Sequence, residues 1–158
     1  MAKQRLMTAM DTKQMLLMLY PDLTVRECDT AVEQGQQVIY GTYIDDDDVP
    51  VSLCAVDWAF GANLGAALTM VPPQTAATVA ETGQFPDVVM GNLREVFNIL
   101  SRIYMDGSSP HLRFAEVRMG KDALTADEAA IIDGCGARLN MEFSVPDYGA
   151  GNCSLITL

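Results

Sequence analysis

Apolar residues recur at spacings of three and four between positions 86 and 104, which is the repeat of one buried helix face. They are Val89, Leu93, Val96, Phe97, Leu100, Ile103 and Tyr104. Because each residue of an α-helix turns the chain by about 100°, four other residues share the opposite face. We name these four the polar ridge: Gly91, Glu95, Asn98 and Arg102. The pattern predicts a helix with one buried face and one exposed polar face.

The rest of the chain alternates between strand-like and helix-like stretches. Strands are expected at 23–32, 36–44, 49–56, 112–118, 137–145 and 152–158, and the second of these runs is rich in β-branched and aromatic residues. Helical patterns occur at 6–20, 58–70 and 126–133, and a shorter segment at 75–81 precedes the long helix. Asp57 is placed to cap the helix at 58–70, and Thr125-x-x-Glu128 forms a capping box before the helix at 126–133.

This order of elements, β-β-β-α-α-β-α-β-β, favours an α+β fold, which is α/β in the broad sense. We expect a mostly antiparallel sheet with two long helices covering one face. Residues 148–151, rich in glycine, are expected to form the hairpin connection between the last two strands. The small residues at 61–65 predict close helix packing, because the segment lacks the Lys-Ser/Thr ending of a phosphate-binding loop.

The composition limits the classes of partner. A chain of 158 residues with 49% hydrophobic and 20% charged residues suits one globular domain, expected to span residues 1–158. The net charge of −11 argues against nucleic acid and anionic membranes, which bind clustered positive charge. Charged residues interrupt positions 1–20, and no run of eighteen apolar residues follows, so we expect a cytoplasmic protein without a signal peptide or membrane span.

Three other features could suggest a metal or catalytic site. The cysteines match no zinc-binding spacing and are expected to be reduced, buried or partly buried thiols; they are Cys28, Cys54, Cys135 and Cys153. The four consecutive carboxylates at 45–48 are expected to form a solvated turn between strands. His111 is the only histidine, and no partner at a telling spacing makes it catalytic, so we expect a structural role.

The pair Glu95 and Asn98 has a possible chemical use. An asparagine amide can hold a water molecule by hydrogen bonds, while a glutamate can pair with a partner's cation, and neither task needs an unusual pKa. The alternative is a local contact on an exposed helix, which contributes about 0.2–0.5 kcal/mol. A small-molecule enzyme has less support, because no nucleophile, base and orienting group stand at a telling spacing.

The Glu95-x-x-Asn98 pair, within this order of elements, resembles the CheC/CheX family of chemotaxis phosphatases over most of the chain. The family motif is commonly Asp or Ser, three residues, Glu, two residues, Asn, three residues and Gly, on a long exposed helix. A single copy is more similar to CheX than to CheC. The resemblance implies removal of phosphate from the aspartyl phosphate of a CheY-like response regulator, with Asn98 placing the attacking water and Glu95 docking onto a receiver lysine. It also implies a homodimer, no cofactor of its own, and Mg²⁺ carried by the receiver.

The flanking motif positions differ from the family pattern. Gly91 stands where Asp or Ser is usual, and Arg102 stands where Gly is usual. Arg102 could block the receiver, form a new docking contact with an acidic receiver surface, or be a solvated residue paired with Asp106. Gly91, Arg94 and Arg102 are therefore candidate partner-binding residues. The alternative function is a catalytically inactive CheX-like adaptor that binds a receiver or scaffold protein.

Overall fold

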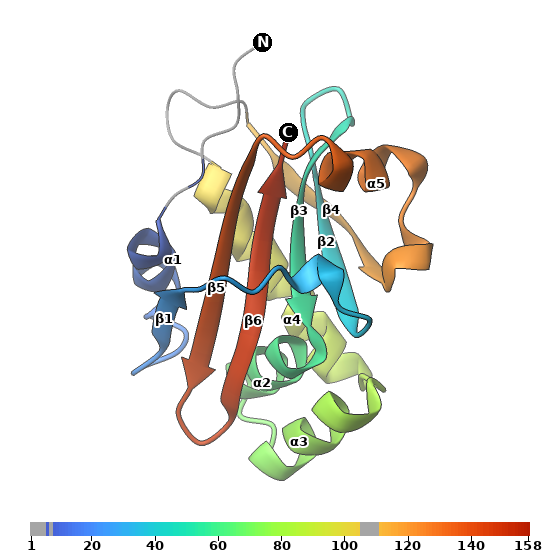
Figure 1. The fold of residues 1–158 in the computed structure, drawn as a ribbon. Coiled ribbons are helices and arrows are strands. Elements are labelled where there is room, and N and C mark those ends of the chain that lie inside the picture. The colour runs from blue at the N-terminus through green and yellow to red at the C-terminus, as the bar shows by residue number, and fades with distance from the viewer. Residues whose placement is uncertain (1–5, 7, 105–110) are drawn as a thin grey trace.

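The computed structural model describes residue 6, residues 8–104 and residues 111–158, with side chains placed in that range except at 103 and 104. Its described part forms an antiparallel sheet in the order β1-β5-β6-β3-β2-β4 (Figure 1). The strands are β1 Thr24–Glu27, β2 Val38–Ile44, β3 Pro50–Asp57, β4 Arg113–Met119, β5 Ala137–Val145 and β6 Gly149–Thr157. The helices are α1 Ala9–Leu16, α2 Trp58–Leu68, α3 Pro73–Thr82, α4 Asp87–Leu100 and α5 Ala126–Asp133. The α+β prediction is confirmed.

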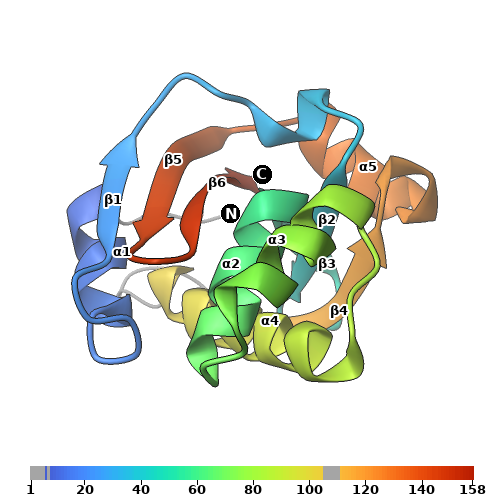
Figure 2. The same cartoon turned by 90° about the horizontal axis from the view of Figure 1, so that it is seen from below.

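Helices cover both faces of the sheet. The long helices α2 and α4 pack together on one face, α3 lies against α2, and α1 lies beside β1 (Figure 2). Short helix α5 and the 3₁₀ turn Val32–Gln34 cover part of the other face, where they enclose a second apolar cluster. Because both faces are covered near the middle of the sheet, every residue of β2 is buried.

Helix α4 is held by contacts on two sides. The Tyr43 hydroxyl of β2 donates a hydrogen bond of 2.6 Å to the carbonyl of Phe97, deep in the core. On the other side, the Asn92 side chain donates bonds of 2.8 Å to the Gly65 carbonyl and to the Thr69 hydroxyl. These bonds satisfy polar groups at the packed faces and fix the orientation of the helix on the sheet.

The small residues at 61–65 allow α2 to approach α4 closely, as the sequence predicts. A Cβ atom on Gly65 would lie 2.8 Å from the Val89 carbonyl oxygen, and one on Gly61 would meet the rings and side chains of Phe85 and Leu93. Asp57 caps α2 by accepting a bond of 2.8 Å from the Phe60 amide, which also confirms the prediction.

Several predicted boundaries were wrong. The helix expected at 6–20 is limited to Ala9–Leu16, because a turn after it brings Tyr20 into the core, where its hydroxyl donates to the Leu64 carbonyl at 2.6 Å. The strand expected at 23–32 ends at Glu27, and the chain then crosses to a 3₁₀ turn. The long helix expected at 86–104 ends at Leu100 and continues as a 3₁₀ turn, Ser101–Tyr104.

The last hairpin also turns earlier than predicted. Gly149 pairs with Val145, so three residues form the connection and most of 148–151 belongs to β6. Asp147 carries the positive φ of 71° in this turn, and aspartate tolerates that conformation better than most side chains. Gly149, which begins β6, has a φ of 132°, so one of the glycines that suggested this location is used at the end of the turn.

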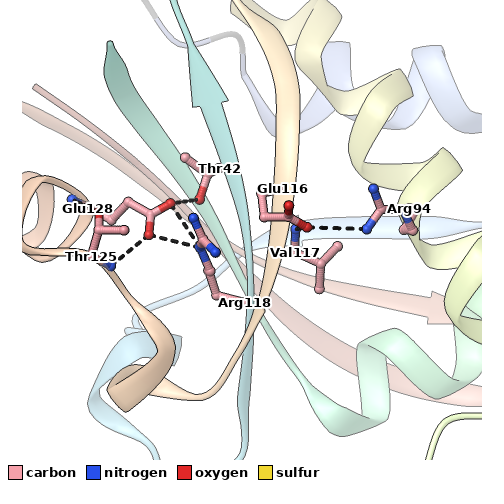
Figure 3. A network of polar contacts seen from close by, with 7 residues as sticks. All are labelled: Thr42, Arg94, Glu116, Val117, Arg118, Thr125 and Glu128. Carbon is pink, nitrogen blue, oxygen red and sulfur yellow. Dashed lines mark hydrogen bonds and ion pairs between the residues drawn. The ribbon is translucent and has the colours of Figure 1, made fainter. Parts of the chain in front are cut away.

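A buried carboxylate joins α5 to two strands (Figure 3). Glu128 is 1% exposed and completes the predicted capping box by accepting a bond of 2.8 Å from the Thr125 amide. It also accepts bonds from the Thr42 hydroxyl at 2.6 Å and from Arg118 Nε at 3.0 Å. Burial acts to raise the pKa of Glu128, but the hydrogen bonds from Thr125, Thr42 and Arg118 outweigh it and lower the pKa below its usual value.

We expect Glu128→Gln to lower the free energy of unfolding by about 2 kcal/mol at pH 7, measured by urea denaturation. Because the folded-state pKa lies below the unfolded value of about 4.3, the contribution of Glu128 is present above that pH and is lost as pH falls through the folded-state pKa. The difference between wild type and variant should therefore shrink on acidification. Glu81→Gln, at an exposed position of α3, is the control and should change stability little; a difference for Glu128→Gln that is independent of pH would contradict this account.

Candidate functional site

The polar ridge lies on the outer face of α4 and its 3₁₀ extension. Gly91, Glu95, Asn98 and Arg102 are all exposed, whereas the five apolar residues from Val89 to Leu100 on the inner face are buried. The predicted division of the helix into two faces is therefore confirmed. No hydrogen bond or ion pair joins the side chain of Glu95 or Asn98 to any other residue in the described ranges. The carboxylate and the carboxamide are thus available to a partner.

The end of α4 next to Asn98 is well fixed. The Ser101 hydroxyl donates a bond of 2.6 Å to the Asn98 carbonyl, and the neighbouring Phe97 carbonyl accepts the bond from Tyr43. The Phe97 ring lies over Gly41 of β2, where a Cβ atom would lie 2.8 Å from the ring. Hydrogen bonds to the Phe97 and Asn98 carbonyls therefore fix the backbone that carries the Asn98 side chain. A side chain that positions a water molecule needs such a fixed backbone.

Arg94 is connected to strand β4 rather than free. Its Nη1 lies 3.6 Å from Glu116 Oε1 (Figure 3). Its guanidinium carbon lies 5.5 Å from the centroid of the Phe114 ring. The same Glu116 oxygen accepts a bond of 3.0 Å from the Val117 amide. Both charged side chains are about half exposed, so we expect the ion pair to contribute less than about 1 kcal/mol. The sequence did not indicate this contact, because it depends on β4 lying at the edge of the sheet beside α4.

Arg102 lies at the end of the ridge, on the 3₁₀ turn after α4. Its side chain is exposed, and it makes no ion pair with any residue that the structure describes. Asp106, the partner considered for it, lies outside the described residues. The other candidate partner-binding residue, Gly91, faces open space: nothing would lie within 4 Å of a Cβ atom there. The structure brings the ridge residues together, and their roles stay predictions.

The other sequence features behave as structural groups. The carboxylates at 45–48 form a turn in which Asp45 accepts bonds from two backbone amides, while Asp46 contacts His111 at 3.3 Å and Asp48 pairs with Arg113. Across residues 8–104 and 111–158, no group of three or more His, Cys, Asp and Glu side chains is arranged to hold a metal ion.

The four thiols are free, and each is buried or partly buried, as predicted. Cys54 and Cys153 lie on neighbouring strands in the core with their sulfur atoms 3.4 Å apart. The contact with Cys54 and burial raise the pKa of Cys153 well above its usual value. In the described part of the chain, the helices are too short or too polar to cross a membrane.

The fold is similar to those of two solved proteins that the sequence analysis did not name. No protein-family model and no curated protein sequence matches the chain. A chain of the FliM–SpeE complex from H. pylori superposes with a TM-score of 0.63 at 5% identity, covering 94% of this chain and 80% of that chain. Thermotoga maritima FliY superposes with a TM-score of 0.54 at 9% identity, covering 92% and 82%. At such low identity the likeness establishes the fold and no shared activity.

Solved CheC-like and CheX proteins are also similar to this chain, at lower TM-scores. A CheC-like superfamily protein from Shewanella sp. PV-4 has a TM-score of 0.48 at 15% identity, and 93% of this chain and 92% of that chain are covered. A chain of the CheX–CheY complex from Borrelia burgdorferi is similar at a TM-score of 0.43 and 13% identity, covering 92% and 91%. The FliM and FliY likenesses are the stronger, and they are the ones that establish the kind of fold.

Gly91→Ala should raise the free energy of unfolding by about 0.5–1 kcal/mol, because an alanine there meets only solvent and favours the helix. Thermal or urea denaturation measures the change. Gly65→Ala is the matched control: its Cβ atom would contact the Val89 carbonyl, and we expect a loss of more than about 1 kcal/mol. A loss of stability for Gly91→Ala would mean that the ridge faces another part of the protein.

Proposed function

We propose that this protein is a CheX-like phosphatase that removes phosphate from the aspartyl phosphate of a CheY-like response regulator. The observation that carries the proposal is the pair of exposed side chains, Glu95 and Asn98, which have no partner in the described chain and project from a firmly held helix. The resemblance of this pair to the CheC/CheX motif supports the same function.

Asn98 acts on the water molecule that attacks phosphorus. Its amide can accept a hydrogen bond from the water and donate one, which holds the water oxygen in line with the bond that breaks. The water oxygen forms a bond to phosphorus as the bond between phosphorus and the aspartyl oxygen breaks. The products are inorganic phosphate, which keeps both protons of the water, and the aspartate carboxylate. Phosphoryl transfer depends mainly on such positioning and on charge stabilisation, so this chain needs no nucleophile of its own.

Glu95 supplies the docking contact. Its carboxylate, one turn before Asn98, is placed to pair with a lysine of the receiver and so to orient the amide toward the phosphorylated aspartate. The Mg²⁺ that supports the reaction belongs to the receiver. The catalytic arrangement is therefore completed only in the complex.

We expect Asn98→Ala to slow the decay of a phosphorylated CheY-like receiver from the same genome by about hundredfold relative to wild type, approaching the receiver's own rate. Loss of the receiver's radiolabelled phosphate measures the decay. Circular dichroism and urea denaturation should show an unchanged fold, because the side chain is exposed and makes no hydrogen bond in the described chain. Gln74→Ala removes an exposed amide from α3 and should leave the rate unchanged. Full activity of the Asn98 variant would refute the assignment.

A catalytically inactive binding module is the second candidate. It is favoured by Gly91 and Arg102 at the flanking motif positions and by the stronger likeness to FliM, which has been solved in complexes with other proteins. Receiver binding without faster phosphate loss would support this candidate. The expected homodimer is a further part of the proposal, and light scattering of the full chain would test it.

A further inference from the structure

Arg102 differs from the other arginines that the structure describes. Each of the others lies within ion-pair distance of a carboxylate of this chain; they are Arg26, Arg94, Arg113, Arg118 and Arg138. Arg102 is exposed and has no such carboxylate among the described residues. In a chain with 21 acidic residues and ten Lys and Arg, an arginine with no acidic neighbour in the described part of the chain differs from the five paired ones. Its charge is available to an anion on a partner.

The location of this charge matters for the approach of a phosphorylated partner. The net charge of −11 repels an anionic phosphosite, and the repulsion must be offset where the two surfaces meet. Arg102 lies four positions after Asn98, on the same exposed face. It therefore places a positive charge beside the amide that the proposed reaction uses.

The Arg102 side chain is long enough to contact the phosphoryl group that Asn98 approaches. Side chains on a helix lean toward its N-terminus, so the long Arg102 side chain can extend over the turn that carries Asn98. A guanidinium presents several N–H donors in a planar fork that matches the oxygens of a phosphoryl group. The shorter Asn98 side chain, which holds the water molecule, cannot also bind the phosphoryl oxygens in this way.

We propose that Arg102 binds a phosphoryl oxygen of the partner's aspartyl phosphate and makes binding to the ridge selective for the phosphorylated partner. This inference rests on the proposed function. The partner it fits is a receiver whose phosphorylation site leaves room for an arginine next to the incoming asparagine. Arg102 is then a specificity-determining residue, and the covalent chemistry described for Asn98 is unchanged.

Binding constants test the inference without relying on turnover. The probe is a purified CheY-like receiver from the same genome, measured by calorimetry with Mg²⁺ alone and with Mg²⁺ and beryllium fluoride, which takes the place of the phosphoryl group. Arg102→Gln should weaken binding to the beryllium fluoride form by about tenfold and leave binding to the unmodified receiver unchanged. Lys121→Gln removes the same charge from an exposed position between β4 and α5, and it should weaken neither complex.

Three results would overturn the inference. Equal weakening of both receiver forms would mean that Arg102 docks on an acidic surface instead of the phosphoryl group. No change in either form would mean that it is only solvated. Faster phosphate loss with Arg102→Gly would mean that the side chain obstructs the receiver.

The inference and the proposed function fail in different ways. Retained phosphate hydrolysis that depends on Asn98, with no effect of Arg102→Gln on binding, would remove the inference and leave the phosphatase. Selective binding that depends on Arg102, without hydrolysis, would keep the inference and favour the adaptor. Absence of wild-type binding to both receiver forms would overturn both.

Discussion

The packing of α4 on the sheet is the constraint on which the candidate site depends. Gly41, in the middle of β2, leaves space for the Phe97 ring, and the Tyr43 hydroxyl of the same strand binds the Phe97 carbonyl. A side chain at position 41 would have to displace the ring from the sheet. Because Asn98 follows Phe97 directly, a shift of this ring would also move the exposed Asn98 amide. Two buried residues of β2, Gly41 and Tyr43, thus fix the position of the exposed Asn98 side chain.

The sequence predicted this helix well because its two faces differ strongly in polarity. Residues at spacings of three and four identify the buried side of α4, and the period alone places Glu95 and Asn98 outside. The helix at Ala126–Asp133 and the strand at Ala137–Val145 were predicted at their observed bounds, since a capping box begins the first and apolar residues alternate with polar ones along the second. Local interactions determine these elements, so local sequence reveals them.

Features that depend on distant parts of the chain could not be predicted in the same way. Arg94 pairs with Glu116 because β4 lies beside β2 at the edge of the sheet. The local sequence around each of these two residues does not reveal the order of the strands. The early end of α1 likewise depends on Tyr20 finding the Leu64 carbonyl, a partner 44 positions away. The polar ridge could therefore be predicted from the sequence. The ion pair of Arg94 and Glu116 beside it became visible only in the three-dimensional structure.

The side chain of Glu116 hinders the addition of a strand from another molecule at the β4 edge of the sheet. Strand β4 is the outermost strand at its end of the described sheet, and such an edge presents backbone groups onto which another strand can add. Glu116 accepts the bond from the Val117 amide and is itself accompanied by Arg94, so one donor of the edge is already occupied and a charge stands in front of it. Sheet extension at this point would have to break that bond and bury a carboxylate. The edge next to the ridge is therefore protected against strand addition.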